Sequence, residues 1–189
     1  MSMKKKVAVA VLLLSVWGGS MIFANTAANK VSVIFNGSEL GDDGALIEGK
    51  TYLPLRQLAS SFQALIEWDS NKKAAVIYKP NVHMFVFQGK SSNSFGIVDR
   101  GSYKFHVFSQ IDNLKTDIAA VKVSIFDPKG KERVIQTESV NQKNDNFWFV
   151  TEEIDYRFET AGKYTIKFFM KMSANDDWTA VSEKVITSR

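Results

Sequence analysis

Hydrophobic and polar residues alternate along most of this chain, and one short segment replaces the alternation with helical spacing. Between residues 30 and 87, brief apolar runs are separated by turn sequences, of which Asn36-Gly37 is the strongest because both positions tolerate a positive φ. Pro54 can open a helix, since its missing N–H costs nothing in the first turn. The apolar residues that then recur at helical spacing are Leu55, Leu58, Ala59 and Phe62. We therefore expect a small α+β module at 30–87, with one helix against an antiparallel sheet.

Residues 96–189 alternate over longer stretches and contain no comparable helical segment. Tyr103 to Gln110 and Tyr164 to Met172 are the clearest strands, and Asp127-Pro128-Lys129-Gly130 fits a β-turn. Six or seven strands at intervals of roughly ten residues predict an immunoglobulin-like antiparallel β-sandwich. The Gly/Ser/Asn-rich stretch 88–95 is expected to be a linker. The predicted fold class is thus mainly β, an α+β module followed by a sandwich.

One turn in the second module has a more specific pattern. Ala161-Gly162-Lys163-Tyr164, directly before a long strand, is similar to the tyrosine corner of immunoglobulin-like domains. The Cys pair and the core Trp of antibody domains are absent from this segment, so only the general immunoglobulin-like architecture is implied.

The first 24 residues have the three-part layout of a secretory signal peptide. Lys4–Lys6 form a basic end, Val7 to Leu14 an apolar core, and Ala24 a small residue at the cleavage site. Cleavage after Ala28 is an alternative. An uncleaved anchor is the other interpretation, because Val7 to Ala24 just reaches the lower limit of about 17 residues for a spanning helix. No later stretch is long and apolar enough to span a membrane.

Composition and charge restrict the partners. Lys4–Lys6 account for three of the 24 basic residues, so a mature chain would hold 21 basic and 20 acidic residues. It has no basic stripe, and a nucleic-acid partner is not expected. With no Cys, the 189-residue chain has neither disulfides nor thiolate metal sites. We expect a bacterial protein that is secreted or associated with the cell envelope, without stable membrane insertion after signal cleavage.

The first module contains a motif that resembles a known family. Tyr52, Pro54 and Arg56 stand in Gly-Lys-Thr-Tyr-Leu-Pro-Leu-Arg, and Trp68-Asp69 follows the predicted helix. This pattern is similar to the copper amine oxidase N-terminal-like domain of many secreted bacterial proteins. The family usually has Gly before the Ala at the helix end, whereas this chain has Phe62-Gln63-Ala64.

The resemblance implies a small exported accessory module and no catalysis. In copper amine oxidases this unit is a stalk, and the copper and quinone chemistry lies in a separate, larger domain. The motif residues are expected to be structural: Arg56 would bond within the fold, and Tyr52 and Trp68 would pack against the helix residues Leu55, Leu58 and Phe62.

Catalytic, metal and cofactor sites are not expected. His83 and His106 are the only two histidines, and we expect them to lie in different modules, without acidic residues at ligand spacing around either. Asp42-Asp43 and Asn175-Asp176-Asp177 lack the alternating oxygen spacing of a calcium loop. Glu152 and Glu153 are expected to be neighbours on a strand, so their side chains would point to opposite faces and could not act as an acid/base pair.

Exposed aromatic residues are the remaining candidates for a contact surface. Phe147-Trp148-Phe149 puts apolar side chains on both faces of one strand, Phe169 stands between two lysines, and Trp178 borders a polar loop. Trp148, Phe169 and Trp178 could contact a cell-wall polymer or an extracellular protein, or could pack within the fold. We expect a secreted, non-enzymatic accessory or binding protein at the cell envelope. The alternative is an inhibitor or regulator of an extracellular enzyme acting through loop 141–146; an enzyme with a site not visible in the sequence is a third possibility.

Overall fold

The protein is described here by a computed structural model that covers residues 29–189 except 42, 143 and 144. The predicted signal peptide at 1–24 and the alternative cleavage site at Ala28 lie outside these described residues. The chain divides into two compact units, Met1–Leu53 and Pro54–Arg189.

The first unit consists of short antiparallel strands. A sheet of order β1-β4-β5 accompanies a β2-β3 hairpin, and Asn36 (φ 49°) and Gly37 (φ 79°) form the predicted tight turn of that hairpin. Gly44 is required at its position, because a Cβ there would lie 2.5 Å from the carbonyl oxygen of Val31 on the paired strand. The strands are β1 (Asn29–Val31), β2 (Ile34–Phe35), β3 (Ser38–Glu39), β4 (Gly44–Ile47) and β5 (Lys50–Tyr52).

The second unit begins with the predicted helix, α2 (Leu55–Ser61). Pro54 is its N-cap, in extended conformation with ψ 108°, and the Pro54 carbonyl accepts the first helical hydrogen bond from the Leu58 N–H at 3.1 Å. Pro54 therefore lies directly before the first helical residue, Leu55, instead of being the first helical residue itself. Ala59 is the buried residue of this short helix.

The helix ends in a left-handed residue. Gln63 has φ 56°, and its N–H donates to the Ser60 carbonyl at 3.0 Å. The Ala64 N–H donates to the Ala59 carbonyl at 2.9 Å. This bond pair is a Schellman motif, which usually places Gly where this chain has Gln63. The departure from the family pattern thus leaves the cap geometry intact.

A β-hairpin follows the helix. It pairs β6 (Leu65–Asp69) with β7 (Ala74–Tyr78), as the alternation predicts. Asp69 closes the turn, because its Oδ1 accepts the N–H groups of Asn71 and Lys72 at 3.0 Å each. The Lys72 N–H is the main reason that the pKa of Asp69 lies below its ordinary value. The motif residue Asp69 therefore has a structural role in this turn.

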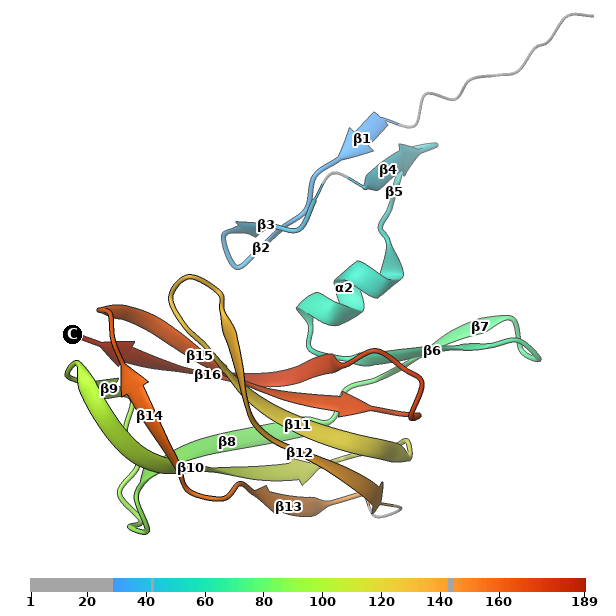
Figure 1. Ribbon diagram of the computed structural model, residues 1–189. Coiled ribbons are helices and arrows are strands. Elements are labelled where there is room, and N and C mark those ends of the chain that lie inside the picture. Colours follow the sequence, from blue (N-terminus) through green and yellow to red (C-terminus); the bar gives the residue numbers. More distant parts are fainter. Residues whose placement is uncertain (1–28, 42, 143–144) are drawn as a thin grey trace, which may run out of the picture. The chain divides into compact units, whose positions relative to one another are not determined.

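The remaining strands form two sheets, antiparallel except for one edge strand, that face each other as a sandwich (Figure 1). In one sheet β10 pairs with β8 along one edge and with β13 and β14 along the other. The other sheet has the order β12-β11-β15-β16-β9, with β9 parallel to β16. The strands are β8 (Asn81–Gln88), β9 (Ile97–Val98), β10 (Gly101–Asp112), β11 (Ile118–Phe126), β12 (Glu132–Gln142), β13 (Phe147–Val150), β14 (Ile154–Phe158), β15 (Gly162–Lys171) and β16 (Thr179–Ser188).

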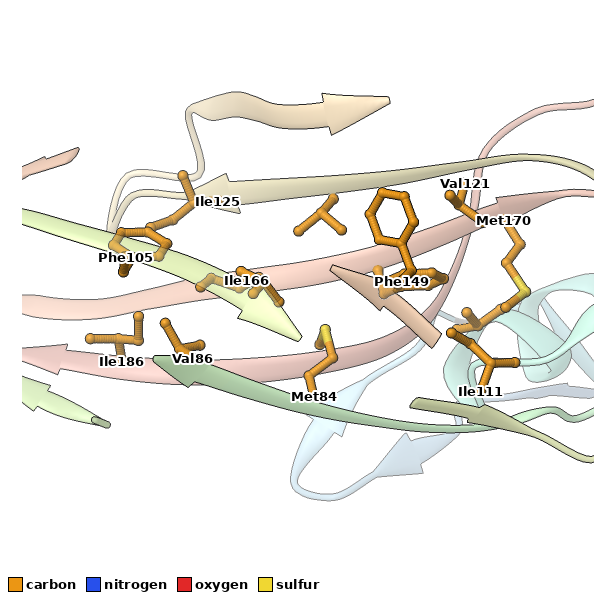
Figure 2. Packing of buried hydrophobic residues seen from close by; sticks show 14 of the residues in the cluster. Met84, Val86, Phe105, Ile111, Val121, Ile125, Phe149, Ile166, Met170 and Ile186 are labelled. Atoms are coloured by element: carbon orange, nitrogen blue, oxygen red, sulfur yellow. The ribbon is translucent and has the colours of Figure 1, made fainter. Parts of the chain in front are cut away.

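The core lies between these two sheets. Figure 2 shows side chains from β8, β10 and β13 turned toward side chains from β11, β15 and β16. Alternate residues of the long strands β10 and β15 are buried, as the period-two pattern of their sequences predicts. The side chains labelled there are Met84, Val86, Phe105, Ile111, Val121, Ile125, Phe149, Ile166, Met170 and Ile186. The predicted fold class is confirmed: the described residues are mainly β, with one helix and a sandwich.

The predicted tyrosine corner is present, and a second, similar turn accompanies it. The Tyr164 hydroxyl bonds the Thr160 backbone four residues upstream, and the Tyr103 hydroxyl accepts the Asp99 N–H at 3.2 Å. Phe158 lies against both rings, with centroids 4.8 Å from Tyr164 and 5.8 Å from Tyr103. Both long strands thus start from a Gly-x-Tyr turn that packs on one phenylalanine.

The structure places residues 81–95 differently from the predicted module boundary. β8 (Asn81–Gln88) pairs with β10 over its whole length, so it belongs to the sandwich and not to a first module ending at 87. The expected linker 88–95 is a turn of the same sandwich, with the Gly89 N–H donating to Lys104 and the Phe95 N–H to Val86. The polar composition of residues 88–95 is thus that of a turn within one domain, not that of a linker between two domains.

Candidate functional site

The outward face of the β8-β10-β13 sheet carries an aromatic surface. Because alternate residues of these strands fill the core, the intervening ones point to solvent. The strand register sets Phe108 beside Phe85 and Val150, and Gln110 beside His83 and Trp148. We name this surface the Trp148 face; its residues are His83, Phe85, Phe87, His106, Phe108, Gln110, Trp148 and Val150.

Exposure and ring geometry distinguish this face from the core. Trp148 is 73% exposed and Phe85 46% exposed, values unusual for such large apolar side chains. The rings of Phe85 and Phe87 lie 6.1 Å apart with planes only 16° from parallel. Phe108 and Trp148 lie 6.0 Å apart at 53°. The Trp148 face therefore offers adjacent aromatic rings as a contact platform.

Two polar side chains of the Trp148 face are fixed by neighbours. His106 Nδ1 lies 2.8 Å from the Gly89 carbonyl oxygen, which can only accept, so Nδ1 carries the proton. In the neutral ring, Nε2 is then a free acceptor. Gln110 donates from Nε2 to Asp112 Oδ2 at 3.0 Å, which leaves its amide oxygen as an acceptor. The rings are thus accompanied by oriented hydrogen-bond acceptors.

Phe169 and Trp178 lie near each other and away from the Trp148 face: Phe169 is on β15 of the other sheet, and Trp178 is in the loop before β16. The Lys122 ammonium lies 4.4 Å from the Phe169 ring centroid and 5.4 Å from that of Trp178. The same ammonium pairs with Glu132 Oε1 at 2.8 Å, and this bond holds the pKa of Glu132 below its ordinary value. We call this group the Lys122 cluster: Lys122, Phe126, Glu132, Phe169 and Trp178. The structure therefore separates Trp148 from the other two predicted contact residues.

The family-motif residues Arg56 and Trp68 border a hollow surface instead of a core. Trp68 is 58% exposed, so the expectation that it is buried against the helix is wrong. The physical reason is that the β6-β7 hairpin has only two strands, and the short helix covers it incompletely. Arg56 is exposed as well. A hollow of about 370 Å³ lies there, lined by Pro54, Leu55, Arg56, Ile66, Glu67, Trp68 and Ala75.

A larger hollow of about 710 Å³ adjoins the same residues. Arg56, Glu67 and Trp68 share it with polar residues of the loops after β10 and β15. Tyr78 Oη donates to Glu67 Oε1 at 2.9 Å, and this bond raises the pKa of Tyr78. We name this hollow the Trp68 cleft; its other lining residues are Leu65, Ile66, Thr116, Asp117, Met170, Met172, Ser173, Asn175, Asp176, Asp177 and Thr179.

Tyr52 lies on β5 in the first unit, where it is 52% exposed. Its neighbour across the sheet is Ala45. Like Trp68, Tyr52 does not have the buried environment expected from the motif, because three short strands provide little surface to cover a large ring.

The motif is matched by a family model. Residues 34–116 match the copper amine oxidase N-terminal domain. The resemblance drawn from Tyr52, Pro54, Arg56 and Trp68-Asp69 is thereby confirmed for this segment. The match extends beyond the predicted end at 87, through β8 and β10.

The copper amine oxidase N-terminal domain is a non-catalytic accessory domain. Two crystal structures of β-glucosidase from Listeria innocua, with isofagomine and with glucose, match at 11% and 12% identity and a TM-score of 0.31. The match covers 61% of this chain and 17% of each enzyme, so nothing about activity follows from it. No match was found among curated proteins.

The histidines and acids considered at the outset are not brought together. His83 and His106 lie on the paired strands β8 and β10 of one sheet, not in different modules as expected, and their partners across the sheet are Gln110 and Phe87. Within the described residues, no three His, Asp or Glu side chains are grouped closely enough to hold a metal ion. Asp42 lies outside those residues, as do 143 and 144 of the proposed inhibitory loop. The helix of the described part is too short to cross a membrane.

Most of the Trp148 face was not foreseen from the sequence. Only Trp148 was a candidate; Phe85, Phe87 and Phe108 were not. The signal in the sequence is that β8 and β10 carry aromatic residues at the positions between the buried ones. A strand with one face in the core and one in solvent normally has polar residues at those positions. When a strand of a two-sheet sandwich carries apolar side chains on both of its faces, one of those faces lies outside the core.

Proposed function

We propose that this chain is a secreted, non-enzymatic accessory protein of the bacterial cell envelope, and that the Trp148 face is its contact surface. The observation that carries the proposal is the exposure of Trp148 (73%) beside Phe108 and Phe85 on one sheet. Contiguous exposed aromatic side chains on a folded domain are typical of interaction sites.

Two further features support the proposal. The matched segment belongs to a type of domain that accompanies catalytic domains without performing chemistry. The N-terminal sequence, with Lys4–Lys6, an apolar core and Ala24, is typical of a cleavable export signal. An exported accessory module is consistent with both.

The proposal is tested on protein recovered from culture. Intact-mass measurement should show a mature chain that starts at Asn25 or, with the alternative cleavage, at Asn29. A retained Met1 to Ala24 segment would indicate a membrane anchor and contradict release. The recovered protein should then sediment with isolated cell envelopes, and Trp148→Ala should abolish this co-sedimentation.

Trp178→Ala is the matched control, because it removes a tryptophan in the loop before β16, beside Lys122 of the opposite sheet. Thermal melts of both variants show whether either loses its fold. If co-sedimentation is absent in the wild type, or survives Trp148→Ala unchanged, the Trp148 face is not the contact surface.

A further inference from the structure

We propose that the Trp148 face binds an uncharged polysaccharide chain. This inference rests on the proposed function, since it names the partner of the same surface. It is argued from three properties of the face: its charge, the arrangement of its rings and the direction of its hydrogen-bonding groups.

Charge complementarity favours an uncharged partner. The eight positions of the Trp148 face carry no acidic, Lys or Arg side chain. Charged residues on the outward side of β10 stand only toward the strand ends, with Lys104 opposite Asp155 at one end and Asp112 at the other. An anionic polymer, a nucleic acid or an anionic membrane surface would require several cationic side chains. The face therefore fits a partner with no formal charge.

The rings match the shape of a sugar chain. A pyranose ring presents a flat patch of C–H groups, which packs on an aromatic face and excludes water from both surfaces. Phe85 and Phe87 form a nearly parallel pair, with ring centroids 6.1 Å apart and planes 16° from parallel. Trp148 and Phe108 form a second group across the sheet. Successive sugar rings of one chain could pack on the two groups.

Two polar side chains of the face, His106 and Gln110, each present an acceptor atom, because another atom of the same side chain is bonded to a neighbour. His106 Nδ1–H is held by the Gly89 carbonyl, and the Gln110 amide nitrogen by Asp112. His106 Nε2 and Gln110 Oε1 can then accept hydrogen bonds from hydroxyl groups. A polysaccharide carries a hydroxyl or amide donor on nearly every ring. A second copy of this chain would bring the same acceptors to the interface, which makes it the poorer fit.

The experiment uses the full mature chain and two uncharged polymers, insoluble cellulose and insoluble chitin, in a co-sedimentation assay. Hexamers of β-1,4-linked glucose and N-acetylglucosamine serve as soluble probes in calorimetry and tryptophan fluorescence. We expect retention on at least one polymer and a fluorescence change on binding of the corresponding hexamer. Trp148→Ala and Phe85→Ala should each weaken binding about tenfold or more, about 1.4 kcal/mol. Trp148→Phe should retain part of the affinity because it keeps an aromatic ring.

The controls separate binding from folding and from other surfaces. Trp148 and Phe85 are exposed, so their alanine variants should melt close to the wild type. Trp178→Ala should leave binding unchanged. If Trp178→Ala abolishes binding and Trp148→Ala does not, the Lys122 cluster is the site and the inference is overturned.

Failure of this inference can be distinguished from failure of the proposed function. If cell envelopes are bound in a Trp148-dependent manner but neither polymer nor hexamer is bound, the partner is not an uncharged glycan, and the contact surface stands. If light scattering shows a dimer that Trp148→Ala dissociates, a second copy covers the face and the inference is overturned. If neither envelopes nor polymers are bound, both proposals fail.

Discussion

The Tyr164 hydroxyl and the Thr160 backbone form a closed pair of hydrogen bonds at the start of β15. The hydroxyl donates to the Thr160 carbonyl oxygen at 3.1 Å and accepts the Thr160 N–H at 3.2 Å. Gly162, at φ 140°, lets the chain turn between them, and a Cβ at this glycine would lie 2.9 Å from the Pro128 ring. Because the Tyr164 ring is buried, this turn ties the strand start to the core.

We expect Tyr164→Phe to destabilise the second unit by about 1–2 kcal/mol, because both bonds to the Thr160 backbone are lost while the ring stays. Tyr103→Phe is the matched control, since its hydroxyl accepts one bond, from the exposed Asp99 N–H. It should cost about 0.5 kcal/mol or less. Urea unfolding of the full chain measures both. Equal losses of stability for the two variants would show that the pair of hydrogen bonds to the Thr160 backbone has no special role.

Gln63→Gly should stabilise the helix end by about 1 kcal/mol, since Gln63 occupies the left-handed region that favours glycine. Gln63→Ala keeps a Cβ in the same conformation and should give no such gain. Thermal melts compare the two variants; a gain of about 1 kcal/mol corresponds to a rise in Tm of roughly 2–4 °C for a chain of this size. A similar rise for Gln63→Ala would point to loss of the glutamine side chain rather than relief of the backbone.

The sequence predicted the elements that depend on local pattern. Single residues with special backbone properties mark two turns and a helix start, and the structure has all three features. They are the turns at Asn36-Gly37 and Gly162 and the helix start at Pro54. The family motif around Tyr52 was equally local, and the family match supports it.

What sequence reasoning missed depended on long-range pairing. Residues 81–87 and Gly101–Asp112 contact each other only after the turn at 88–95 closes, so β8 could not be assigned to the sandwich by periodicity alone. The prediction that Trp68 is buried was wrong for a related reason. Whether a side chain is covered depends on how much surface the neighbouring elements supply. The Trp148 face was not predicted for the same reason, because its residues come together only through the pairing of β8 with β10.

Two buried hydroxyls of the β10 sheet should respond in opposite ways to removal. Thr151 Oγ1 accepts the Val107 N–H at 2.9 Å and bridges the break between β13 and β14. Thr151→Val should cost about 1–3 kcal/mol, because a buried N–H loses its acceptor. Ser109 Oγ is buried without a hydrogen-bond partner, so Ser109→Ala should be neutral or stabilise by up to about 1 kcal/mol. Urea unfolding measures both, and a marked loss for Ser109→Ala would reveal a partner for that hydroxyl.

The Lys122–Glu132 pair should make stability depend on acid pH. The folded pKa of Glu132 lies below its unfolded value of about 4.3. Its contribution is therefore complete above that value and is lost as the pH falls through the folded pKa. Wild type should have a higher Tm than Glu132→Gln at pH 7, and the difference should shrink between pH 5 and the acid limit of folding. A difference that stays constant with pH would show that the carboxylate charge is not what stabilises the fold.

The strand pairing of β8 predicts where the chain can be cut. A fragment of residues 80–189 keeps the whole sandwich, whereas 95–189 lacks β8, which contributes Met84 and Val86 to the core and the Val82 carbonyl that accepts from Ser182 Oγ at 2.9 Å. Each lost apolar side chain is worth about 1.5–3 kcal/mol, a large share of the 5–15 kcal/mol that typically stabilises a domain. We expect 80–189 to melt cooperatively with a β-type circular dichroism spectrum, and 95–189 to aggregate or melt without a transition. Residues 54–189, the complete second unit, serve as the positive control. If 95–189 melts as cooperatively as 80–189, then β8 is dispensable and the boundary predicted at 95 is the correct one.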